Sequence, residues 1–118
     1  MFYSQYDFKK SVIIQFNVEG VHYYPGAPSE VIYLEDRHRH TFIVRAGYYV
    51  EHTNRDKEIF ICRDKILSYL KAEYGDPCLF GPMSCEMIAE KILNFGLADG
   101  MFWCEVWEEQ TGGGRVEI

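Results

Sequence analysis

The chain has 118 residues, of which 47% are hydrophobic and 16% aromatic, and its formal net charge is −6. This length suits one domain with a core and is too short for two, so residues 1–118 are expected to form a single domain. The acidic balance and the scattered basic residues argue against a nucleic-acid partner, because such proteins concentrate Lys and Arg. No run approaches the roughly 18 apolar residues that span a bilayer, and the first ten residues lack a signal-peptide core, so we expect no membrane partner and a cytoplasmic location.

Two strands are predicted in the first part of the chain. Residues 12–21 alternate between apolar and polar side chains, which is typical of a half-buried strand. Turn-forming residues at positions 24–28 end this strand, and a loop runs on to Asp36. Residues 39–51 alternate again, and Gly47 within them is expected to mark a bulge.

A helix is predicted to follow. Residues 58–62 are rich in β-branched and aromatic side chains and are expected to be a short extended segment that leads into it. Ile66 and Leu70 belong to the apolar stripe of this helix, and Gly75 is its expected C-terminal stop.

A second helix and two further strands complete the predicted fold. Ser84 is the expected N-cap of the helix, and Gly96 lies at or near its end. Residues 102–108 alternate as a strand, the glycines at 112–114 are expected to turn the chain, and residues 115–118 form a last strand. This order predicts an α+β fold with a four-stranded antiparallel sheet, whose exposed edges favour association into a homo-oligomer.

The cysteines show no C-x-x-C spacing, so neither a zinc ribbon nor a thioredoxin motif is indicated. Reduced, packed thiols are the favoured interpretation. Cys78 and Cys85 remain alternative reactive thiols near the helix junction, because Cys85 falls at a helix N-terminus, where a thiol pKa can be depressed.

Three histidines are the most informative residues. His22 follows the first predicted strand, and His38 and His40 open the second. Residues i and i+2 of a strand share one face, so His38 and His40 are able to converge on His22 from the neighbouring strand. Three neutral imidazoles with a vacant fourth position make a zinc site of the catalytic type. The competing interpretation is ordinary surface or hydrogen-bonded histidines, since H-x-H alone is a weak signal.

Three segments carry a resemblance to a known family: Phe16-x5-His22, His38-Arg39-His40 and Val106-Trp107-Glu108. Together with the element order, they resemble the 6-pyruvoyltetrahydropterin synthase and 6-carboxytetrahydropterin synthase family. The resemblance implies the tunnelling fold, with two helices between the second and third strands and subunits joined into an oligomeric barrel, either a trimer or a hexamer. It also implies Zn²⁺ held by His22, His38 and His40.

The same resemblance implies a ligand. A glutamate in the last strands of the family holds a pterin or purine-like ring. Glu108 matches this glutamate, and the next residue, Glu109, is the alternative. A carboxylate accepts two parallel hydrogen bonds from a guanine-like edge, so a pterin or a guanine-like molecule of the 7-deazapurine (queuosine) pathway is the expected small-molecule partner.

The chain departs from the family at its catalytic positions. Leu34 stands where the family has a catalytic cysteine, and Pro77 replaces the histidine of an Asp-His pair, of which Asp76 remains. Glu35 and Asp76 are the candidate catalytic residues. For Glu35 a solvated loop carboxylate is the favoured alternative.

Two function classes therefore stay open. One is a zinc-dependent lyase of the family type with altered catalytic residues. The other is a non-catalytic protein of the same fold that binds a nucleotide-like or pterin-like ligand.

Overall fold

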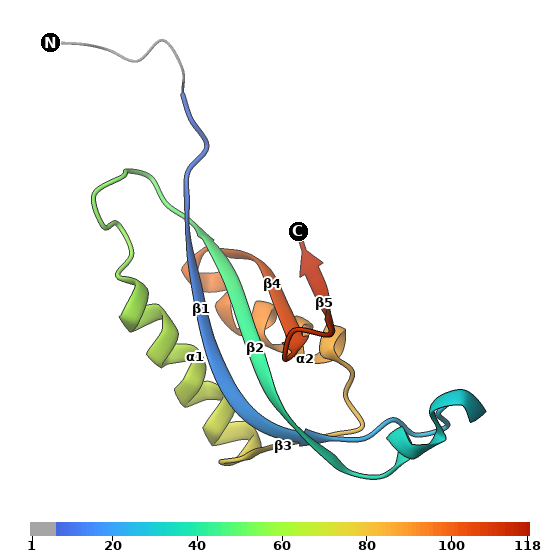
Figure 1. The fold of residues 1–118 in the computed structure, drawn as a ribbon. Coiled ribbons are helices and arrows are strands. Elements are labelled where there is room, and N and C mark those ends of the chain that lie inside the picture. The colour runs from blue at the N-terminus through green and yellow to red at the C-terminus, as the bar shows by residue number, and fades with distance from the viewer. Residues whose placement is uncertain (1–6) are drawn as a thin grey trace, which may run out of the picture.

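Five strands form one open mixed sheet in this computed structural model, which describes residues 7–118. The strands are β1 (Ser11–His22), β2 (His38–Tyr49), β3 (Cys78–Gly81), β4 (Met101–Glu108) and β5 (Gly112–Glu117). Their spatial order is β3-β1-β2-β4-β5, and all neighbours are antiparallel except β1 and β3, which run parallel (Figure 1). The α+β class is confirmed. The prediction of four antiparallel strands is wrong, because a short fifth strand lies between the two helices.

The additional strand, β3, joins the sheet beside the end of β1. Gly20 pairs with Cys78 and His22 with Gly81. Four residues between Pro77 and Pro82 are too few to show a period of two, which is why the sequence pattern did not predict this strand. The pairing brings the segment after β3 next to His22.

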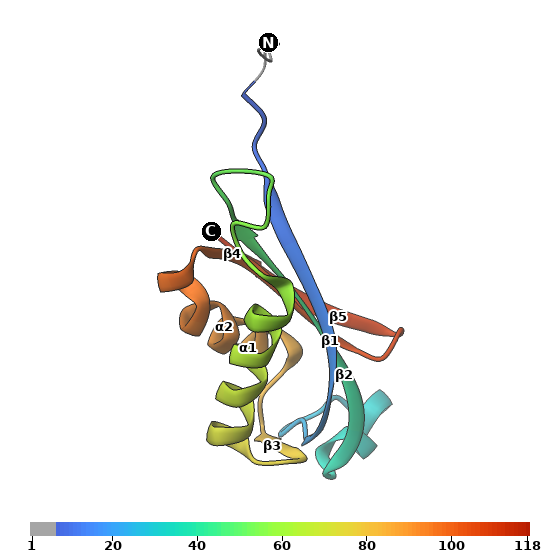
Figure 2. The same ribbon diagram turned by 90° about the vertical axis from the view of Figure 1, so that its left-hand side faces the viewer.

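Both α-helices, α1 (Ile59–Tyr74) and α2 (Cys85–Gly96), cover the same face of the sheet (Figure 2). The α1 stripe buries Cys62, Ile66 and Leu70 at i, i+4 and i+8, as an amphipathic helix requires. These side chains pack with those of α2 against the inward residues of the strands, among them Phe42 and Val44 of β2. Two 3-10 segments, η1 (Ser29–Glu35) and η2 (Leu97–Asp99), lie in the connections.

The capping residues determine where the helices begin and end. The Glu58 carboxylate accepts a hydrogen bond from the Ile61 amide at 2.9 Å, so the prediction of an extended segment over residues 58–62 is wrong. A side-chain cap outweighs the strand preference of the residues that follow it. The expected stop at Gly75 and the expected N-cap at Ser84 are confirmed.

The glycines near the C-terminus are part of a strand. The turn between β4 and β5 lies at residues 109–111, where Glu109 has a φ of 54°, and Gly112 already belongs to β5. The prediction of a turn at 112–114 is therefore wrong. A Cβ at Gly114 would lie 2.7 Å from the Glu86 amide nitrogen, so glycine lets β5 pass close to the start of α2.

The expected bulge is confirmed, because the β2–β4 register shifts between Gly47 and Tyr48. No helix within residues 7–118 has the length and apolar character needed to cross a membrane.

Candidate metal centre

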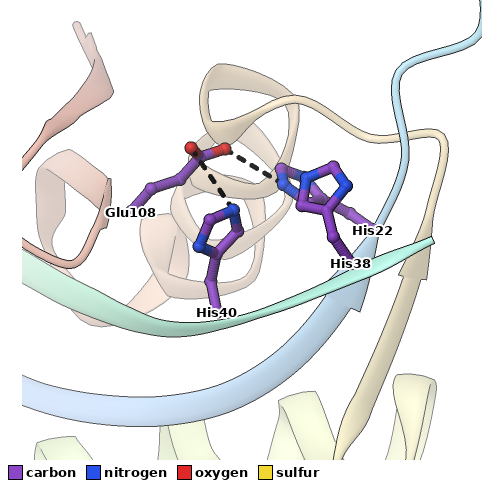
Figure 3. A group of neighbouring side chains, drawn as sticks. All are labelled: His22, His38, His40 and Glu108. Carbon is purple, nitrogen blue, oxygen red and sulfur yellow. Dashed lines mark ion pairs between the residues drawn. The ribbon is translucent and has the colours of Figure 1, made fainter. Parts of the chain in front are cut away.

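The three histidines lie at adjacent strand ends and point toward one another (Figure 3). His22 of β1 is paired with His38 of β2, and His40 follows two residues later on the same face. The ring centroids are 4.5 Å apart for His22 and His38, 5.3 Å for His22 and His40, and 5.0 Å for His38 and His40. Phe42 lies beneath the cluster, with its ring 5.1 Å from that of His22. The predicted convergence is confirmed in geometry.

Two of the rings are oriented by backbone carbonyls. His22 Nδ1 lies 3.0 Å from the carbonyl oxygen of Met83, and His38 Nδ1 lies 2.8 Å from that of Asp36. A carbonyl only accepts hydrogen bonds, so each Nδ1 carries a proton, and in the neutral ring Nε2 then keeps a free lone pair. Metal-binding histidines are held in this way by outer partners.

Glu108, at the end of β4, brings a carboxylate to the same point. Its Oε1 lies 3.0 Å from His22 Nε2, and its Oε2 lies 3.5 Å from His40 Nε2 (Figure 3). On the other side of the His40 ring, Glu109 Oε1 lies 3.5 Å from Nδ1. The two neighbouring glutamates therefore face opposite edges of one imidazole.

The Nε2 atoms of His22 and His40 are buried and have no hydrogen-bond partner. His22 is only 6% exposed, and this burial lowers its pKa, which favours the neutral ring. A neutral Nε2 and a carboxylate oxygen are both acceptors, so they repel each other unless a cation lies between them. The donor set fits a metal ion: one atom from each of His22, His38, His40 and Glu108 lies within 4.8 Å of the others.

A cavity of about 580 Å³ opens beside the cluster, a size that suits a small-molecule ligand. Its wall includes His22, His38 and Glu108, together with Leu34 and the two neighbouring tyrosines, Tyr23 and Tyr24. The histidine–glutamate group and the cavity therefore form one site.

The two candidate catalytic carboxylates lie elsewhere. Glu35 is exposed, and its carboxylate accepts a hydrogen bond of 3.4 Å from the Gly26 amide. Asp76 Oδ2 lies 3.6 Å from Lys71 Nζ on α1. Neither residue lines the cavity, whereas Leu34 does.

Cys85 is a wall residue whose surroundings the sequence did not reveal. Burial first, and the nearby Glu108 charge second, raise its thiol pKa to about 12. Burial also raises the pKa of Cys78 to about 11. All four cysteines are free and buried, as predicted, and neither alternative thiol has the depressed pKa that reactivity requires.

Comparison with protein-family models and with curated proteins gives no match for this chain.

Proposed function

We propose that this protein binds a zinc ion through His22, His38 and His40 and takes a pterin-like or guanine-like small molecule in the adjoining cavity. The proposal rests on one observation. Buried imidazole nitrogens without hydrogen-bond partners face a carboxylate, and one cation bound to all of these atoms would satisfy them. Zinc suits the donors, since it takes imidazole and carboxylate ligands in a tetrahedral arrangement.

The ring-binding part of the proposal rests on the chemistry of the cavity wall. Tyr23 and Tyr24 provide aromatic surface for a flat heterocycle, and Glu108 provides a carboxylate that is partly open to the cavity, with 34% of its side chain exposed. Pterins and guanine carry adjacent N–H and NH2 donors that match the two carboxylate oxygens. Adenine lacks this donor pair and should bind more weakly.

Calorimetry with pterin, guanine and adenine compounds tests this selectivity. Loss of a hydrogen bond to a charged group costs roughly 1.5–3 kcal/mol, so Glu108→Gln should weaken pterin and guanine binding by about tenfold to more than a hundredfold. Glu90→Gln removes a carboxylate charge from the exposed surface of α2, outside the cavity wall, and serves as the control, with unchanged affinity expected. Equal binding of all three ring types by the wild-type protein would contradict the proposal.

Binding without turnover is the better supported of the two function classes. Glu35 and Asp76 lie outside the cavity, and Leu34 gives its wall an aliphatic side chain with no acid or base. A zinc-dependent lyase remains the second candidate because the metal-binding group borders the cavity, and a bound zinc ion supplies Lewis-acid chemistry. Incubation of the zinc-loaded protein with dihydroneopterin triphosphate decides between them: product formation would support the lyase.

We also propose that the chain has the tunnelling fold and assembles into a homo-oligomer, either a trimer or a hexamer. The two sheet edges, β3 and β5, each have one strand neighbour in the described chain, and the helices cover one sheet face (Figure 2). Unpaired strand edges favour main-chain pairing with another subunit. Light scattering that gives a monomer mass at micromolar concentration would contradict this assembly.

A further inference from the structure

We propose that Glu108 is itself the fourth metal ligand, so that the metal centre without a ring ligand is a closed site of three imidazoles and one carboxylate. The inference rests on the proposed zinc site but not on the identity of the ring. It gives Glu108 a role at the metal in addition to the ring contact proposed above.

The first support is the spacing of the donor atoms. Ligands about 2.0–2.2 Å from a tetrahedral zinc ion are about 3.3 Å apart. The two contacts of the Glu108 carboxylate, 3.0 Å to His22 Nε2 and 3.5 Å to His40 Nε2, lie on either side of that value. A carboxylate that served only a ring would have no reason to face the Nε2 atoms of two imidazoles, both buried and without a hydrogen-bond partner.

The second support is charge. Three neutral imidazoles leave the two positive charges of a divalent ion uncompensated beside the buried ring of Phe42. Burial of unpaired charge is costly, and a carboxylate ligand lowers the net charge of the centre. Among the described residues, Glu108 supplies the acidic side chain of the four-residue donor group. Glu109 faces the opposite edge of His40 and therefore acts as an outer partner.

The third support is the position of Glu108 in the sheet. The residue pairs with Phe42 on β2 and with Gly112 on β5. The Glu109 amide donates to the Thr41 carbonyl oxygen at 3.1 Å, which fixes the chain directly after it. The carboxylate is thus held at the cluster by a paired strand, which favours a precise ligand position.

A closed site has a consequence for ligand binding. A ring that takes both Glu108 oxygens has to draw this carboxylate away from the metal. Metal and ring then compete for one side chain, and by linkage each lowers the affinity of the other by the same factor.

Cobalt substitution tests the inference, because the visible spectrum of Co²⁺ reports its ligands directly. In the wild-type protein the fourth position is filled by Glu108, so added azide should leave the spectrum unchanged. In Glu108→Gln that position opens, so azide should change the spectrum, and Co²⁺ affinity should fall by at least about tenfold. Glu86→Gln, the charge-matched control in the same wall, should behave as wild type.

The outcomes separate this inference from the proposed zinc site. Failure of both wild type and Glu86→Gln to bind Co²⁺ would overturn the metal site and the inference with it. Co²⁺ binding with an equal azide response in wild type and Glu108→Gln would overturn the inference alone. Circular dichroism checks that Glu108→Gln is folded. If Glu108→Gln does not fold, the Co²⁺ spectrum of the wild-type protein is the test. A change on addition of azide contradicts a closed site, and an unchanged spectrum supports one.

Discussion

Glu108 Oε1 lies 3.0 Å from His22 Nε2, although no hydrogen bond joins the two atoms. The reason is the other nitrogen of the ring, since His22 Nδ1 faces the Met83 carbonyl oxygen and holds the proton there. A lone pair and a carboxylate oxygen at this separation repel each other, and a cation bound to both atoms would relieve the repulsion. This relationship is the strongest indication that the cluster is a metal centre and not a group of packed histidines.

Removal of a histidine ligand should abolish metal binding. His38→Ala leaves two imidazoles at the centre. Mutation of a residue that only orients a ligand lowers metal affinity by about tenfold to a hundredfold, so loss of a ligand itself should lower zinc affinity by more than about a hundredfold. Titration calorimetry measures the change. His52→Ala is the control, because His52 is exposed, pairs with Asp56, and follows the end of β2 opposite the one that carries the cluster. Equal zinc affinity in the two variants would refute the assignment.

The metal-free protein should lose stability below about pH 6.5. Burial lowers the His22 pKa in the folded state, whereas the unfolded chain takes up this proton near the ordinary value of about 6.5. The contribution of His22 to stability is therefore fully present above pH 6.5 and is lost as pH falls toward the folded pKa, by at most about 1.4 kcal/mol per pH unit.

Urea unfolding at pH 7.5 and pH 5.5 measures this loss. His22→Gln removes the titrating group, so its stability should fall less over the same interval than that of the wild-type protein. An identical fall in both proteins would show that other groups cause the pH dependence.

Gly47 should be sensitive to a single added methyl group. A Cβ at this position would collide with the indole of Trp103, which lies over the glycine at the β2–β4 bulge. Gly47→Ala is expected to lower the free energy of unfolding by about 1–3 kcal/mol. Gly112→Ala is the control, since nothing lies within 4 Å of its added Cβ. Denaturant unfolding that shows equal stability for both variants would contradict the packing described here.

The convergence of the histidines was predictable because it depends on local rules. Residues i and i+2 of a strand share a face, so His38 and His40 had to point the same way, and His22 needed only the neighbouring strand. The orientation of the rings was not predictable, since Met83 is 61 residues from His22 and contributes a backbone carbonyl that any residue type has.

The elements that the sequence pattern did not predict also have physical explanations. Strand β3 is too short to show a period, and the cap at Glu58 overrides the strand preference of the three residues after it. The family resemblance implied a ring-binding role for Glu108, which stays a prediction. The contacts of this residue with two imidazoles depend on how β4 lies beside β2, which only the three-dimensional structure reveals.

X-ray absorption at the zinc edge, on protein loaded with one equivalent of zinc, tests the metal centre most directly. We expect nitrogen and oxygen ligands at about 2.0–2.1 Å, with the outer-shell scattering of several imidazoles and no sulfur at about 2.3 Å. A sulfur ligand, which would point to a cysteine such as Cys85, or a spectrum without imidazole scattering would contradict this expectation.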